Sequence, residues 1–118
     1  MPKDTTSRGK EAEQFAEQFL ANAGLTLVTR NFACKLGEID LIMRCKDTLV
    51  FIEVRLRSRG AFAHAAETVT PSKQHKIRKT AAVYLQKHPY NCPCRFDVVA
   101  VSLNYNQFSA DWIQNAFD

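Results

Sequence analysis

The sequence predicts a single α/β domain, with a mixed central sheet flanked by helices in the order α-β-β-β-α-β and a last short strand. Three observations predict it: an amphipathic repeat at residues 8–23, two apolar runs around a polar gap at 45–48, and a nearly continuous apolar run at 95–101. A chain of 118 residues with 46% hydrophobic content is long enough for one domain with its own core. We expect residues 1–7 to be a disordered tail and residues 8–118 to form the domain.

The first helix is expected over residues 8–23. Its apolar side chains recur with the spacing of one helical face: Ala12, Phe15, Ala16, Phe19, Leu20 and Ala23. Gly24 fits the position just past a helix C-terminus, where the backbone adopts a left-handed conformation. Residues 25–32 then form a first strand.

Residues 37–44 and 49–55 predict a β-hairpin whose turn lies in the gap 45–48. With the turn centred there, Asp40 falls opposite Glu53. Directly opposed residues hold their Cβ atoms roughly 4.5–5.5 Å apart, and like charges so placed are destabilising. A divalent cation is the usual reason for such a pair, because Mg²⁺ is held by one or two carboxylates plus waters and substrate phosphate.

A solvated charged patch is the alternative interpretation of this hairpin. In the same register Glu38 falls opposite Arg55, and such a cross-strand ion pair is worth only ~0.2–1 kcal/mol. The alternative explains Glu38 and Arg55, but it does not explain Asp40 beside Glu53. The two-carboxylate metal site is therefore the favoured interpretation.

The second half of the chain predicts a helix between two strands. Residues 57–69 are expected to be a mobile loop, and Thr70 and Pro71 fit the N-cap and first position of a second helix. The apolar face of that helix is formed by Ile77, Ala81, Tyr84 and Leu85. Residues 95–101 read as a strand covered on both faces, and a last short strand or turn holds Trp112 and Ile113.

Composition allows a polyanionic partner and an intracellular location. The net charge of +4 and the pI near 9.0 are a mild basic bias. The sequence has no long apolar run and no signal peptide, so we expect a cytoplasmic protein without a membrane partner. Its four cysteines are expected to be ordinary thiols. Cys92, Cys94 and the nearby His88 have a poor spacing for zinc, although a zinc site stays open.

The order and spacing of several short motifs, together, carry a family resemblance. They lie at residues 31–32, 37–42, 51–55, 69–74, 95–101 and 115–117. Over residues 8–118 the chain resembles the PD-(D/E)xK restriction-endonuclease-like superfamily, which includes Holliday-junction resolvases, and more closely the YraN-type family of small bacterial proteins. The resemblance implies a restriction-endonuclease-like domain in which Asp40 and Glu53 bind Mg²⁺ or Mn²⁺.

Arg55 departs from the superfamily pattern, which has a lysine that positions or activates the attacking water. An arginine keeps its proton near neutral pH and cannot be a general base, but it could neutralise charge on the reacting phosphate. The resemblance also implies a site-facing glutamate at Glu13, with a glutamate on a solvated flank as the alternative. It implies a site-facing Gln74, with a glutamine bonded to local backbone near the helix start as the alternative.

The sequence therefore predicts a nucleic-acid-binding protein and a candidate Mg²⁺-dependent endonuclease, with DNA as the expected partner and a homodimer allowed. Arg57, Lys73 and Lys76 are the expected phosphate-binding residues. One alternative is a catalytically inactive module of the same fold that binds nucleic acid or a protein partner. A zinc-stabilised interaction domain is the other.

Overall fold

A computed structural model describes residues 7–57 and 69–118 of the chain. These residues form, in order, α1 (Ser7–Asn22), β1 (Thr26–Cys34), β2 (Gly37–Cys45), β3 (Thr48–Arg57), α2 (Pro71–Lys87), β4 (Cys94–Asn104) and β5 (Gln107–Phe117). The predicted fold class and element order are confirmed. The mobile loop predicted at 57–69 and the tail predicted at 1–7 fall almost entirely outside the described residues.

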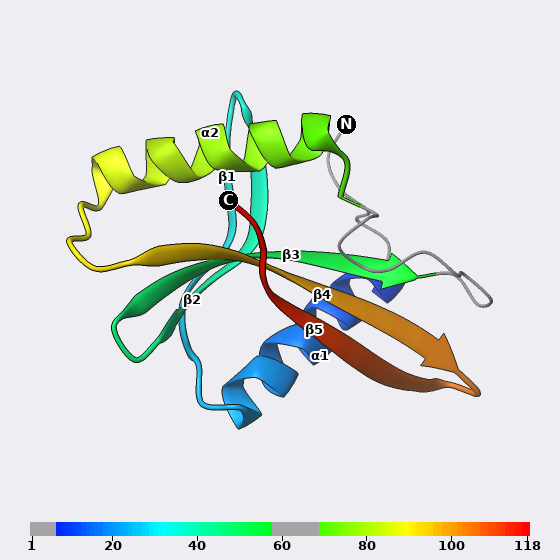
Figure 1. The fold of residues 1–118 in the computed structure, drawn as a ribbon. Coiled ribbons are helices and arrows are strands. Elements are labelled where there is room, and N and C mark those ends of the chain that lie inside the picture. Colours follow the sequence, from blue (N-terminus) through cyan, green and yellow to red (C-terminus); the bar gives the residue numbers. More distant parts are fainter. Residues whose placement is uncertain (1–6, 58–68) are drawn as a thin grey trace.

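The described strands form one mixed sheet in which sequence neighbours are also spatial neighbours. Their order is β1-β2-β3-β4-β5; only β3 and β4 run parallel, and the other neighbours are antiparallel. A parallel pair needs a long crossover connection, and α2 lies in that crossover. Figure 1 shows the two helices on opposite sides of the sheet, with the β1–β2 hairpin rising past α2.

The face of the sheet that meets α1 holds the first of two apolar clusters. The helix contributes Ala12, Ala16 and Leu20, each almost completely buried, as the amphipathic repeat predicts. Alternate residues of the central strands complete this cluster: Leu41, Met43, Val50, Ile52, Val54, Val99 and Val101. The centre of this half of the core therefore consists of aliphatic side chains and Met43, with Phe15, Phe19 and Trp112 packed around it.

The opposite face packs on α2 and is richer in aromatic side chains. Tyr84 of α2 lies edge-on to Phe32 and Phe51, with ring centroids 5.2 and 6.1 Å away. Ile77 and Ala81 are buried beside it, which confirms the apolar face predicted for this helix. The predicted cap is also present, because the Thr70 hydroxyl accepts a hydrogen bond from the Lys73 N–H at 3.2 Å.

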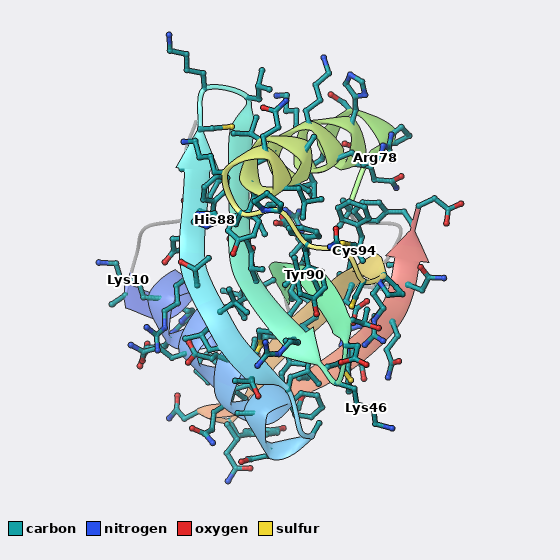
Figure 2. All side chains as sticks on the ribbon, turned by 90° about the vertical axis from the view of Figure 1, so that its left-hand side faces the viewer. Lys10, Lys46, Arg78, His88, Tyr90 and Cys94 are labelled. Atoms are coloured by element: carbon teal, nitrogen blue, oxygen red, sulfur yellow. The ribbon has the colours of Figure 1, made fainter. Side chains whose placement is uncertain are left out.

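The chain returns from α2 to the sheet across the end of the β2–β3 hairpin. Figure 2 shows His88, Tyr90 and Cys94 along this connection. The Tyr90 hydroxyl donates to the carbonyl of Asp47 at 2.6 Å, and the Leu49 N–H donates to the carbonyl of Pro93 at 2.9 Å. These contacts fix where β4 enters the sheet beside β3.

β5 is longer than the sequence predicts, because it spans Gln107–Phe117 rather than a short turn around Trp112 and Ile113. Its pairing with β4 is irregular between Phe96 and Val98. Asp97, completely buried at that point, accepts hydrogen bonds from the Trp112 indole N–H at 2.8 Å and from the backbone N–H of Asn115 at 2.9 Å. A buried carboxylate thus holds the irregular end of the edge strand.

No helix in the described part of the chain is long and apolar enough to cross a membrane.

Candidate functional site

The predicted hairpin register holds near the turn and ends before the two carboxylates. Pairing between β2 and β3 runs from Cys45–Thr48 to Leu41–Ile52. The alternation of β2 then breaks, since Ile39 packs in the same α2-side cluster as Ile42 rather than with Leu41. On β1, Asn31 lies between the residues that pair with Leu41 and Ile39, and it has a left-handed φ of 51°. An irregularity across β1 and β2 therefore sets the direction of Asp40.

Asp40 is a buried carboxylate that hydrogen-bonds to the backbone of β3 at this irregularity. Its residue surface is 1% exposed, and Oδ2 accepts a hydrogen bond from the Val54 N–H at 2.7 Å. A charged acceptor makes this hydrogen bond stronger than a neutral one. This hydrogen bond connects β2 to β3 beyond the last backbone pair, Leu41–Ile52, and fixes the position of the Asp40 carboxylate next to Val54.

Glu53 is the second buried carboxylate, 3% exposed, and two cations approach it. The Lys73 ammonium lies 3.1 Å from Glu53 Oε2, whereas the Arg55 Nη1 lies 3.8 Å from the same oxygen. Both contacts are ion pairs, and the lysine is the closer of the two cations. Arg55, which the alternative interpretation pairs with Glu38, makes an ion pair with Glu53 on its own strand.

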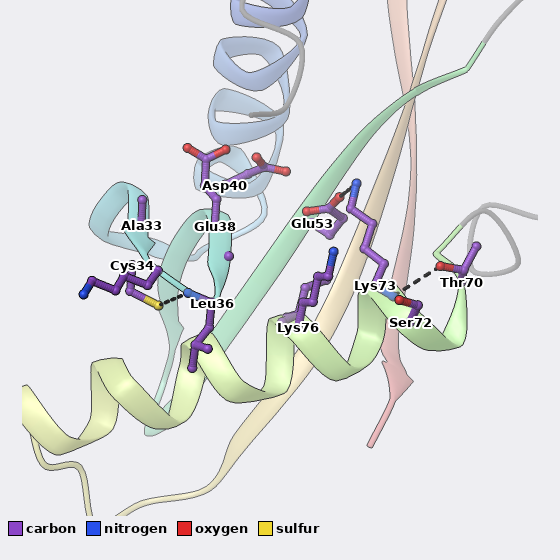
Figure 3. Close-up of a pocket in the computed structure, with 13 residues that line it drawn as sticks. Ala33, Cys34, Leu36, Glu38, Asp40, Glu53, Thr70, Ser72, Lys73 and Lys76 are labelled. Carbon is purple, nitrogen blue, oxygen red and sulfur yellow. Dashed lines mark hydrogen bonds and ion pairs between the residues drawn. The ribbon is translucent and has the colours of Figure 1, made fainter. Parts of the chain in front are cut away.

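Both carboxylates line one pocket of about 690 Å³ between the β1–β2 turn and the start of α2. Figure 3 shows Lys73 and Lys76 projecting from α2 into this space, with Asp40 and Glu38 on β2 facing them. The remaining lining residues come from the turn and from the helix start: Ala33, Cys34, Lys35, Leu36, Gly37, Thr70, Ser72 and Ile77. The pocket is therefore built by three separate segments that meet at the point where β2 leaves β3.

The formal charges that line the pocket balance. Glu38, Asp40 and Glu53 oppose Lys35, Lys73 and Lys76. A divalent cation added to this set would leave a net positive site, to which a phosphate diester is attracted. The pocket chemistry therefore favours joint binding of a hard cation and a phosphate.

The donor set fits Mg²⁺ or Mn²⁺ better than zinc. Two carboxylates from neighbouring strands suffice for Mg²⁺, which keeps several waters and takes further ligands from substrate phosphate. Within residues 7–57 and 69–118, no three His, Cys, Asp or Glu side chains are grouped for metal binding. A structural zinc site needs four such ligands, so the Cys92, Cys94 and His88 alternative gains no support from the described residues. All four cysteines are free thiols.

The other predicted site residues lie outside the pocket lining. Arg57 donates to the Ser102 hydroxyl at 3.1 Å and pairs with the carboxylate of Asp111. Glu13 accepts a hydrogen bond from the side chain of Asn31 at 3.0 Å, next to the irregularity at Asp40.

Gln74 donates to the carbonyl of Val69 at 2.9 Å, which is the local-backbone contact described by the alternative interpretation.

Several pocket residues escaped the sequence analysis, and Cys34 is the most distinctive. Burial raises the pKa of its thiol, but the hydrogen bond from the Leu36 N–H and the contact with the Thr80 hydroxyl outweigh that effect, so the pKa lies below its ordinary value. No local motif marks this residue. It enters the pocket because the β1–β2 turn folds back onto α2, which is a tertiary contact.

We expect Gly37→Ala to lower stability by roughly 1–3 kcal/mol, the usual cost of overpacking. A Cβ at Gly37 would lie 3.0 Å from the Thr80 hydroxyl oxygen, where the turn meets α2. Urea unfolding of Gly37→Ala, Thr80→Ala and the double variant measures this. If this contact is the cause, the double variant loses less unfolding free energy than the two single variants lose together. Strict additivity would show that the turn does not press on Thr80.

Comparison with known proteins places these residues in a family. Residues 12–101 match the model of the uncharacterised protein family UPF0102. A UPF0102 protein of Nitrosomonas europaea is 48% identical over 112 residues, covering 95% of this chain and 94% of the relative. One from Nitrosococcus oceani is 43% identical over 118 residues, with 98% and 95% covered. The family inferred from the hairpin and helix motifs is confirmed: the chain belongs to the UPF0102, or YraN-type, family.

Proposed function

We propose that this protein binds nucleic acid and hydrolyses its phosphodiester bonds with the help of Mg²⁺ or Mn²⁺ held by Asp40 and Glu53. One observation carries the proposal: two buried carboxylates from neighbouring strands share a pocket with lysines from α2. Carboxylates are rarely buried unless they are paired, and here the Val54 N–H and the Lys73 ammonium are among the partners. The charges that line the pocket are also those that a cation and a phosphate would meet. The cation supplies Lewis-acid chemistry, because it stabilises negative charge that develops on phosphoryl oxygens.

The protein's own residues orient the carboxylates and supply positive charge to the pocket. Asp40 is oriented by the Val54 N–H and Glu53 by Lys73, so both carboxylates are held in place before substrate arrives. The Lys76 ammonium points towards the pocket in Figure 3, and its positive charge would attract a phosphate. Arg55, 32% exposed at its side chain, lies close enough to Glu53 to add positive charge without accepting a proton.

The test is a cleavage assay on single-stranded, duplex and branched DNA with Mg²⁺, with Mn²⁺ and with a chelator. The proposal expects cleavage that requires the metal and that survives further purification in constant ratio to the protein. Asp111→Asn is the matched control, because Asp111 is an exposed carboxylate outside the pocket and its variant should cleave as the wild type does. Metal-independent cleavage, or activity that separates from the protein, would contradict the proposal.

A binding module without catalysis is the second candidate, and position 55 favours it. The chain carries Arg55 where the superfamily resemblance expects a lysine. Salt-sensitive binding, together with inert wild-type protein on every DNA shape and with both metals, would replace the enzyme proposal by this one. If the wild-type protein shows neither binding nor cleavage of nucleic acid, its function would instead depend on a protein partner.

Nucleic-acid binding should weaken steeply with salt, and the pocket lysines should carry that dependence. Each phosphate contact to single-stranded nucleic acid contributes about 0.7 to the slope of log affinity against log salt. We expect Lys76→Ala to lower the slope by about that amount, whereas Arg57→Ala should change it less, since Arg57 is already paired with Asp111. Fluorescence anisotropy of a labelled oligonucleotide over a salt series measures both slopes. Equal slopes in all variants would place the phosphate contacts elsewhere.

A further inference from the structure

The charge at the start of α2 is unusual and calls for a partner. Helix N-termini favour acidic side chains, because the helix dipole is positive there. The first turn of α2 has no acidic residue and instead carries Lys73, whose backbone N–H is bonded to the Thr70 cap. A lysine in this place costs electrostatic free energy unless a carboxylate compensates it. Glu53, 3.1 Å away, is that carboxylate.

The geometry separates Lys73 from the other cation beside Glu53. Both side chains are about one-third exposed, 37% for Lys73 and 32% for Arg55. The lysine lies closer to Oε2, at 3.1 Å against 3.8 Å for the arginine, and of the two only the lysine lines the pocket. The two cations therefore differ in their distance from Glu53 and not in how exposed their side chains are.

We propose that Lys73, supplied by α2, is the positioning lysine of the Asp40–Glu53 site, in the place that the resemblance gives to strand position 55. Its ammonium pairs with the Glu53 carboxylate at 3.1 Å and lines the same pocket as both carboxylates. The proposal rests on the function proposed above. It adds that the site does not lack a lysine although position 55 is an arginine, because Lys73 reaches Glu53 from α2 rather than from β3.

The first test needs neither metal nor nucleic acid. A double-mutant cycle of Lys73→Met and Glu53→Gln, followed by urea unfolding in a chelator, measures their coupling. We expect about fivefold in the unfolding equilibrium constant, an estimate that allows for the exposed lysine end. The matched cycle of Arg55→Met and Glu53→Gln should give less than about twofold. Coupling that is absent at Lys73, or equal at both positions, would overturn the assignment whatever the protein does.

The second test pairs metal affinity with the cleavage rate, because a merely structural ion pair would change the first and not the second. The Lys73 ammonium competes with a metal ion for Glu53, so Lys73→Met should bind Mn²⁺ roughly fivefold to tenfold more tightly, as measured by calorimetry. Lys76→Met removes the same charge from the same pocket and should change the affinity by less than about threefold. Where cleavage is measurable, Lys73→Met should also be slower, and Lys73→Met with Arg55→Lys should regain part of the rate.

The outcomes separate the two proposals. Tighter Mn²⁺ binding with slower cleavage supports Lys73 as the positioning residue, because damage to the fold would weaken the metal site rather than strengthen it. Equal Mn²⁺ affinity in wild type and Lys73→Met overturns that role while leaving the metal site standing. No Mn²⁺ binding to the wild type overturns the metal-dependent function and the positioning role together, even if the stability cycle shows the ion pair.

Discussion

Asp97→Ala is expected to destabilise the protein by about 3 kcal/mol or more, the cost of leaving a buried charge network without its partner. Asp97 is completely buried and accepts from Arg95, from the Trp112 indole and from the Asn115 N–H. Its removal would strand all three donors where β5 meets β4. Urea unfolding followed by fluorescence measures the loss, and Trp112, the only tryptophan, reports directly on this contact.

Asp111→Ala is the matched control for that experiment. Asp111 also pairs with an arginine, but its side chain is 63% exposed. Exposed ion pairs contribute about 0–1 kcal/mol, so this variant should unfold close to the wild type. An Asp97→Ala variant within about 1 kcal/mol of the wild type would show that Asp97 does not hold β5.

Asp40→Asn should abolish metal-dependent cleavage, with a loss on the order of 10³-fold or more if the carboxylate supplies the charge that the reaction needs. The amide keeps an oxygen that can accept from the Val54 N–H, so the link between β2 and β3 should survive. Binding of nucleic acid in the absence of metal should stay intact or become slightly tighter, because a negative charge facing phosphate is removed. Parallel cleavage, binding and unfolding measurements separate these effects.

An Asp40→Asn variant that cleaves as well as the wild type would remove Asp40 from the reaction. A variant that loses cleavage, binding and stability together would show a folding defect instead. Asp40→Ala offers the contrast, since it also removes the acceptor for Val54 and should be less stable than Asp40→Asn.

Local patterns in the sequence predicted most of the fold. The apolar spacing of residues such as Ala12 and Leu20 requires a helix against a sheet, and Thr70 with Pro71 marks the start of α2 from its own chemistry. The hairpin register followed from the position of its turn and holds as far as Leu41–Ile52. Each of these features depends on neighbours in the chain, which is why they could be predicted.

What could not be predicted depends on tertiary contacts. The alternation of residues 37–44 gives no sign that β2 breaks its pattern at Asp40, because the break is shared with Asn31 on the neighbouring strand. The Lys73–Glu53 contact depends on where the crossover helix settles on the sheet. The full length of β5 could not be predicted, because its residues are only exposed or half-buried and its irregular end is held by Asp97.

The proposed function requires Asp40 and Glu53 to hold a divalent cation together. The most direct test is an anomalous diffraction map from crystals soaked in Mn²⁺. We expect one strong peak in the pocket, about 2.1 Å from a carboxylate oxygen of each residue, as hard cations bind oxygen ligands. The absence of a peak between Asp40 and Glu53 at saturating Mn²⁺, with the Lys73 ammonium still on Glu53, would contradict the proposed function.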